Sequence, residues 1–158
     1  MNKPTVSIIT PMWKGADLVA DTIESVLKQD FNDWEMIIVD DCSPDNGAGA
    51  NVVQSYVDKD SRIKLIRATV NRGSSGARNQ AMEVAQGQYF AFLDSDDIWH
   101  EKYLSTMMNY IQKNEDDSVA IFFASYRRMN SKCEAELLSP YIFEGKRSYK
   151  QLLRHCPI

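Results

Sequence analysis

The run Met36-Ile37-Ile38-Val39 constrains the fold of this chain more than any other feature of its sequence. Every position of the run is apolar, which is typical of a strand that helices cover on both faces of a sheet. Further short apolar runs alternate along the chain with apolar residues at helical spacing, and this alternation predicts βαβ units and a mainly parallel sheet. We therefore expect an α/β protein.

Strands and helices are expected to take turns as far as Tyr126, and the pattern weakens beyond it. Pro11 is expected to close the first strand, and Gly87 to stop the third helix in a left-handed cap. A short final helix is expected at residues 148–155. The other strands are expected at residues 6–9, 36–39, 63–66, 89–93 and 119–124, and the other helices at residues 18–27, 50–57, 75–85 and 104–111.

Composition and charge argue against several classes of protein. The 158 residues carry a formal net charge of -4, which argues against a nucleic-acid partner because phosphate backbones call for clustered Lys and Arg. Cys42, Cys133 and Cys156 form no CxxC or Cys/His pair, so neither a disulfide framework nor a zinc site is supported. No run approaches the roughly 20 apolar residues of a transmembrane segment. We expect reduced thiols and a cytoplasmic protein, with peripheral association at the inner face of the membrane as an alternative.

Residues that packing alone does not explain follow the ends of the first four expected strands. In an open parallel sheet these ends share one edge, and ligands bind outside it. The segments are Pro11-Met12-Trp13-Lys14, Asp40-Asp41-Cys42-Ser43, residues 71–79 and Asp94-Ser95-Asp96-Asp97. Their convergence predicts a ligand site at this edge.

The segment Asp94-Ser95-Asp96-Asp97 is the sharpest of these signals. Three carboxylates within four residues repel one another unless a cation or a shared proton relieves them. Mg²⁺ and Mn²⁺ prefer carboxylate oxygen, and Mg²⁺ commonly takes one or two carboxylates together with substrate phosphates. One carboxylate of the turn could then reach a metal while another holds a ribose hydroxyl. The alternative is that Asp96 or Asp97 caps a helix that begins near His100.

The segments after the first two strands offer contacts for a nucleobase. Asp41 is placed to accept a hydrogen bond from a base N–H, although Asp40-Asp41 also fits a solvated turn with Ser43 as a local cap. Trp13 fits the core, or a platform on which a base stacks.

The segment after the third strand offers contacts for a phosphate. Gly73 and Gly76 permit close backbone approach to a ligand, and Arg72 and Arg78 could meet a diphosphate. This segment matches neither the P-loop nor the Rossmann GxGxxG pattern.

Taken together, these segments resemble the inverting family 2 glycosyltransferases, whose donor domain has the GT-A fold. The resemblance covers roughly residues 4–125 and implies a Rossmann-like, mainly parallel sheet flanked by helices. It places a donor-binding core at residues 1–126 and an incomplete start of the acceptor-side segment at residues 127–158. The motifs that carry it are Val6-Ser7-Ile8-Ile9-Thr10-Pro11, Ile38-Val39-Asp40-Asp41-Cys42-Ser43, Gly76-Ala77-Arg78-Asn79, Ala85-Gln86-Gly87-Gln88-Tyr89 and Phe92-Leu93-Asp94-Ser95-Asp96-Asp97.

The resemblance also implies a role for each site residue. Base contacts fall on Trp13 and Asp41, next to Pro11, and diphosphate contacts on Arg78, with Arg72 near it. Ribose and a Mn²⁺ or Mg²⁺ ion fall on the acidic segment, with Asp96 as the first choice of metal ligand beside Asp94 and Asp97, and with Ser95 among the donor contacts. Trp13-Lys14 departs from the commoner Tyr-Asn of the family, and the general base and acceptor site are expected beyond residue 158.

The implied activity is transfer of a sugar from a UDP-, GDP- or dTDP-sugar to a carbohydrate or lipid-linked acceptor, with inversion, in the synthesis of cell-envelope polysaccharide. A non-catalytic nucleotide-sugar-binding module and a sugar nucleotidyltransferase remain alternatives. The sequence lacks the basic, glycine-rich loop directly after the first strand that would favour the nucleotidyltransferase. A phospho-acceptor signalling domain also fits paired acids after a strand, but it leaves Arg78 and the acidic segment unexplained.

Overall fold

The computed structural model describes residues 3–114, 121–122, 124, 128–129 and 135–136. The chain divides into two compact units, residues 1–114 and residues 115–158. In the second unit, β5 (Arg128–Met129) and β6 (Ala135–Glu136) pair antiparallel. The described residues of the strand expected at 119–124 are not in a strand, and the expected helix at 148–155 lies outside the described residues.

The first unit is built on a parallel four-stranded sheet in the order β3-β2-β1-β4, which confirms the expected fold class. Its strand order reverses between β1 and β4. Such a reversal opens a crevice at the carboxyl ends of the strands, where α/β proteins bind ligands. The strands are β1 (Val6–Met12), β2 (Trp34–Asp40), β3 (Ile63–Arg67) and β4 (Tyr89–Phe92).

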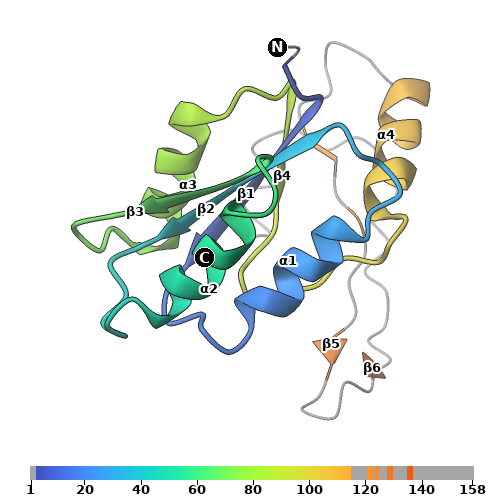
Figure 1. Cartoon of the computed structure of the whole chain (residues 1–158). Helices are drawn as coiled ribbons and strands as arrows, with labels where there is room; N and C mark the ends of the chain where they lie inside the picture. Colours follow the sequence, from blue (N-terminus) through green and yellow to red (C-terminus); the bar gives the residue numbers. More distant parts are fainter. Residues whose placement is uncertain (1–2, 115–120, 123, 125–127, 130–134, 137–158) are drawn as a thin grey trace, which may run out of the picture. The chain divides into compact units, whose positions relative to one another are not determined.

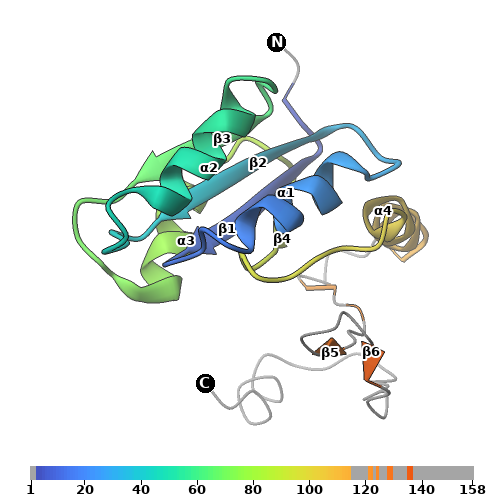
Figure 2. The ribbon, with the colours of Figure 1, turned by 60° about the horizontal axis from the view of Figure 1, so that its bottom comes forward.

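Helices cover both faces of this sheet. Helices α1 (Val19–Leu27) and α2 (Ala48–Val57) lie on one face and α3 (Gly73–Val84) on the other (Figures 1 and 2), and α4 (Tyr103–Lys113) completes the unit. All residues of β1 and β2 are buried, as the apolar run in β2 predicted. Ala77 and Ala81 pack from α3 onto the sheet, and their small side chains let the helix approach closely. None of the described helices has the length and apolar character needed to cross a membrane.

Pro11 does not close the first strand, because β1 continues to Met12 and pairs with β2 along its whole length. The residues of β1 alternate between their two neighbours: Thr5 and Ile9 accept hydrogen bonds from the β4 side, whereas Met12 accepts one from Asp41. Pro11 falls on the β4 side, beyond Ile9, the last residue of β1 that β4 pairs with. A missing N–H therefore breaks no ladder hydrogen bond there.

Gly87 is not in the left-handed conformation that was expected of it. Positive φ among the described glycines occurs at Gly47 and Gly73, and α3 ends in extended backbone at Ala85. Gly87 is instead required by close packing, since a Cβ at this position would lie 2.5 Å from the backbone nitrogen of Ser7. Its own N–H donates to Ser7 Oγ at 2.8 Å, so it joins the segment before β4 to the start of β1.

Candidate functional site

A cleft of about 550 Å³ opens at the carboxyl ends of β1, β2 and β4. It draws its walls from all four segments that follow the strands. Those segments are far apart in the sequence, and the parallel topology brings them together. Seven of the residues expected to bind a donor line it: Pro11, Trp13, Asp41, Arg78, Asp94, Ser95 and Asp96.

Asp41 lies at one end of the cleft, directly after β2, and is only 3% exposed. Its Oδ1 atom accepts a hydrogen bond from the backbone N–H of Arg72 at 2.9 Å. Asn71 donates to the Asp41 backbone carbonyl at 3.0 Å, which fixes the loop after β3 against the end of β2. Within the described residues no hydrogen bond reaches Oδ2, so this oxygen can accept one from a ligand in the cleft.

Trp13 does not belong to the core, since 52% of the residue is exposed and its ring borders the cleft. The adjacent Lys14 places its ammonium 4.3 Å from the centroid of the Trp13 ring. A largely exposed indole beside a buried carboxylate is an arrangement that suits a flat heterocycle, which can stack on the ring and hydrogen-bond along its edge.

The acidic segment lies at the other end of the cleft, directly after β4. Arg78 of α3 forms an ion pair with Asp94, with 2.5 Å between Nη2 and Oδ1. Asp96 lines the cleft and is exposed. Neither Asp96 nor Asp97 caps the next helix, because α4 begins at Tyr103 with Lys102 as its N-cap.

Asp97 does not line the main cleft. It lines a neighbouring hollow of about 350 Å³ together with Arg78, Phe92 and Asp94. Desolvation, together with the negative charges of Asp96 and Asp94, raises the pKa of the Asp97 carboxyl, although much of the residue is exposed. The acidic segment thus carries negative charge that Arg78 alone does not balance.

Buried polar side chains in α1 and just after it hold the acidic segment and the chain that follows. Thr22 donates its hydroxyl to the Asp97 carbonyl at 2.9 Å, and Ser25 Oγ accepts the N–H of Trp99 at 3.1 Å. Gln29 donates to the His100 carbonyl at 2.8 Å and accepts the N–H of Leu104 at 2.9 Å. The anchoring of the segment after β4 therefore explains why Thr22 and Ser25 of α1, and Gln29 just after it, are polar although buried.

Arg72 is brought near the cleft but does not line it. Its backbone N–H donates to the Asp41 carboxylate. A Cβ added at Gly76 would lie 2.4 Å from the Cβ of Arg72 and clash with it. The absence of a side chain at Gly76 thus makes room for Arg72 and not for a ligand. Gly73 lines the cleft with a φ of 73°, and a Cβ added to it would meet no atom within 4 Å, so the approach stays open.

Several residues that line the cleft had no role predicted from the sequence, and Met12, Gly15 and Leu18 are among them. Met12 is buried with its side chain between Gly15 and Gly49, and a Cβ at Gly15 would lie 2.7 Å from Met12 Cγ. Leu18 is half exposed on the rim. Gly15 follows Trp13-Lys14 directly and could have been noticed, whereas Met12 and Leu18 look like ordinary apolar residues of a strand and a helix.

The described residues of this site do not form a metal site from three protein side chains. Throughout the part of the chain that the structure describes, no group of three or more His, Cys, Asp or Glu side chains is placed to hold an ion. The cleft offers Asp96 and Asp94, a number that matches the one or two carboxylates that Mg²⁺ takes when phosphate oxygens supply further ligands.

Comparison with known proteins points to one family. The profile described as Glycosyl transferase family 2 matches residues 7–157. TuaG of Bacillus subtilis (strain 168), a glycosyltransferase whose name assigns it to teichuronic acid biosynthesis, is 43% identical over 127 residues, covering 80% of this chain and 48% of TuaG. WfgD of Escherichia coli, named UDP-Glc:alpha-D-GlcNAc-diphosphoundecaprenol beta-1,3-glucosyltransferase, is 34% identical over 158 residues, covering all of this chain and 58% of WfgD.

Solved structures agree on the fold. The mannosyltransferase PcManGT from Pyrobaculum calidifontis, in complex with GDP-Man and Mn²⁺, superposes with a TM-score of 0.65 at 24% identity, over 75% of this chain and 34% of that one. Residues 1–349 of S. aureus TarS, in complex with UDP, give a TM-score of 0.64 at 23% identity, over 79% and 41%. These neighbours are GT-A glycosyltransferases. The chain spans about half the length of the curated relatives it matches.

Proposed function

The chain belongs to glycosyl transferase family 2, and we propose that it supplies the nucleotide-sugar and metal site of an inverting glycosyltransferase. The donor is a UDP-, GDP- or dTDP-sugar, and the acceptor is a carbohydrate or lipid-linked hydroxyl in cell-envelope polysaccharide synthesis. The protein would work in the cytoplasm or at the inner face of the membrane. The relatives named for teichuronic acid and for an undecaprenol-linked sugar support this assignment of pathway.

One observation carries the proposal: a single cleft joins a base-binding end to an acidic end. The base end lies after β2 and β1, with Asp41 and Trp13, and the acidic end lies after β4. Adjacent strands are about 4.8 Å apart, so β2 and β4, which flank β1, lie about 10 Å apart across the sheet. A nucleoside diphosphate can span that separation, with its base and its phosphates at opposite ends.

Five of the lining residues then have a role in binding the donor. Trp13 stacks on the base, and Asp41 accepts the base N–H through Oδ2. Asp94 and Ser95 lie where the ribose and first phosphate pass. Arg78, already paired with Asp94, is placed to meet the diphosphate with a guanidinium that matches its geometry.

The charge of the cleft fits a divalent cation. Asp41, Asp94 and Asp96 outnumber Lys14 and Arg78 among the residues that line it, and a diphosphate would add further negative charge. Asp96 would be the first ligand of Mn²⁺ or Mg²⁺, with Asp94 beside it, and the bound ion would neutralise charge that develops on the leaving diphosphate. The raised pKa of Asp97 has part of its cause in the same excess of negative charge.

The reaction would be an in-line displacement at the anomeric carbon. The acceptor oxygen forms a bond to that carbon while its proton passes to a carboxylate base, for which we look beyond residue 158. The bond from the anomeric carbon to the diphosphate breaks on the opposite side, and its electron pair leaves with the diphosphate. Residues of this chain bind and orient the donor for that step.

Thermal stability in the presence of nucleotides tests the proposal first. A ligand that binds only the folded state raises the melting temperature with the logarithm of its concentration. We expect one of UDP, GDP or dTDP to stabilise the protein with Mn²⁺ or Mg²⁺ and not with EDTA, and Asp96→Ala to abolish that shift. The protein should then release the matching nucleoside diphosphate from its sugar when an acceptor is present. Stabilisation by no nucleotide, with any metal, would contradict the proposal.

A further inference from the structure

Lys14 is held in an unusual backbone conformation beside the cleft. Its φ is 55°, in the left-handed region that lysine rarely adopts. The surrounding loop stabilises this conformation, since the Lys14 N–H donates to Ser43 Oγ at 2.9 Å. Ser43 is itself fixed by Asp40, whose Oδ1 accepts hydrogen bonds from both the hydroxyl and the N–H of Ser43. Asp40, at the end of β2, and Ser43, after it, thus fix the backbone of one exposed lysine that follows β1.

The Lys14 ammonium has no carboxylate partner in the part of the chain that the structure describes. The ion pairs found there are Arg62–Asp60, Lys64–Glu35 and Arg78–Asp94. The Lys14 Nζ atom lies 4.3 Å from the centroid of the exposed Trp13 ring, and both residues line the cleft. The ammonium lies over the face of the ring, so a heterocycle that stacks on this face would displace it toward the edge of the ring, where it can meet the edge of that heterocycle.

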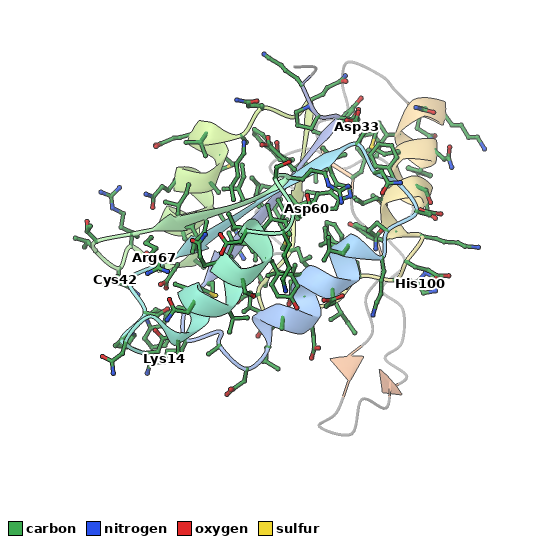
Figure 3. All side chains as sticks on the ribbon, in the orientation of Figure 1. Lys14, Asp33, Cys42, Asp60, Arg67 and His100 are labelled. Carbon is green, nitrogen blue, oxygen red and sulfur yellow. The ribbon has the colours of Figure 1, made fainter. Side chains whose placement is uncertain are left out.

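Lys14 belongs to the base end of the cleft. Its backbone N–H donates to the hydroxyl of Ser43, after β2. Figure 3 shows Lys14 at the same end of the sheet as Cys42 and Arg67, which follow or end β2 and β3. Ser43 lies two residues after Asp41, so we assign the ammonium to the base.

We propose that Lys14 is a specificity-determining residue, whose ammonium donates a hydrogen bond to a carbonyl oxygen of the nucleobase and rejects an amino group at the same position. This inference rests on the proposed function, because it names the part of the donor that one residue of the same cleft reads.

The selection follows from the chemistry of the two side chains. The Asp41 carboxylate accepts hydrogen bonds only, and the Lys14 ammonium donates them only. Uracil, thymine and guanine each present a ring N–H next to an exocyclic carbonyl, which matches that pair. Cytosine and adenine present a ring nitrogen lone pair next to an amino group, so acceptor meets acceptor and donor meets donor. The site would favour the first three bases over the last two.

Calorimetric titration with UDP, dTDP, GDP, CDP and ADP in the presence of Mn²⁺ tests this inference. We expect the protein to bind UDP more tightly than CDP, and Lys14→Met to lower that ratio of affinities about tenfold, as expected for loss of one hydrogen bond to a charged group. Lys14→Arg should keep the preference, since it keeps a cationic donor. Lys14 is exposed, so its variants should melt with the unchanged protein when no nucleotide is present.

Lys59→Met is the matched control, because the Lys59 ammonium also lies over an aromatic ring, that of Tyr56, but outside the cleft. It should leave every affinity unchanged. If Lys14→Met weakens UDP and CDP by one common factor, the ammonium acts on the phosphates or on the Trp13 platform and the inference is wrong. An unchanged ratio and unchanged affinities also overturn it, while the proposed function stands. If the unchanged protein binds none of the nucleotides, the proposed function fails as well.

Discussion

The amino end and the carboxyl end of the central sheet both carry acidic and polar residues. Among the described residues, those at the carboxyl end are available to a ligand, whereas those at the amino end are bonded within the protein. At the amino end, Glu35 Oε1 accepts hydrogen bonds from the Ser7 hydroxyl and the Gln86 N–H, both at 2.6 Å, and Oε2 accepts one from Lys64 at 2.7 Å. At the carboxyl end, Asp41 is as well buried as Glu35 but has a single described partner for its carboxylate, the Arg72 N–H on Oδ1.

This difference separates two kinds of motif that look alike in sequence. A buried acid whose oxygens are all bonded within the protein stabilises the fold, because loss of any partner leaves a desolvated polar group. A buried acid with a free oxygen that lines a cleft has an acceptor to offer a ligand. The Ala85–Tyr89 motif serves the first kind, because the Gln86 N–H donates to Glu35, and the Ile38–Ser43 motif holds the second kind, which is Asp41. Both motifs entered the family resemblance together.

Replacement of Asp96 by Ala, at the carboxyl end of the sheet, should give the largest effect of these variants. It should lower the rate of sugar transfer and leave the stability of the fold intact. We expect about a thousandfold loss of sugar transfer, near 4 kcal/mol, because the metal's contribution to the charge of the leaving group is lost. The melting temperature without ligand should stay the same or rise, since one of three neighbouring carboxylates is removed. Steady-state kinetics and thermal melts measure the two effects.

Glu83→Ala serves as the control, because Glu83 is an exposed acid of α3 outside the cleft. It should change neither quantity. Equal loss of transfer in both variants would show that general surface charge matters, and the distinction between the two ends would then fail.

Gly87→Ala, at the amino end of the sheet, should give the next largest effect. It should lower the free energy of unfolding and leave nucleotide binding intact. The added Cβ would meet the Ser7 backbone nitrogen at 2.5 Å and the Val6 carbonyl carbon at 2.8 Å. Neither backbone atom can move without disturbing β1, so we expect a loss of about 3 kcal/mol in the free energy of unfolding. Urea titration measures it. Nucleotide affinity, measured under conditions in which the variant is fully folded, should be unchanged.

Gly73→Ala provides the contrast for that measurement. Gly73 has φ of 73° and open space around it, so the substitution adds backbone strain without a clash, and roughly 1 kcal/mol is expected. If Gly73→Ala costs as much as Gly87→Ala, close packing at the amino end is not what requires Gly87.

Sequence patterns predicted the parts of this molecule that depend on local periodicity. The apolar run of β2 could be recognised as a buried strand because both of its faces had to be covered. Trp13 could not be assigned to the core or to the cleft from its pattern, since a single aromatic residue shows no repeat of buried and exposed positions. The Glu35 network was missed for another reason: its partners lie 28, 29 and 51 positions away, and only the register of the strands brings them together.

Glu35→Gln should have a smaller effect than Gly87→Ala. The amide keeps the shape of the side chain but removes the charge that strengthens the hydrogen bonds from Ser7 and Gln86, and its NH₂ group has nothing to offer the Lys64 ammonium. We expect a loss of about 2 kcal/mol in the free energy of unfolding, with unchanged nucleotide affinity. A change in affinity comparable to that of Asp96→Ala would mean that the two ends of the sheet are not independent.

The pH dependence of that loss should be the smallest of these effects and tests the cause assigned to it. Burial raises the pKa of the Glu35 carboxyl, but the hydrogen bonds from Lys64, Ser7 and the Gln86 N–H outweigh it and hold the pKa below the ordinary value of 4.5. The unfolded chain therefore takes up the proton first as the pH falls, so the stabilisation is complete above the ordinary pKa and is lost as the pH falls through the lower folded value. Urea titrations from pH 7 down to pH 3 should show the difference between the unchanged protein and Glu35→Gln constant at first and then shrinking. Because the Glu35 side chain is only 6% exposed, added salt should reduce the difference only slightly. A difference that grows in acid would contradict a lowered pKa.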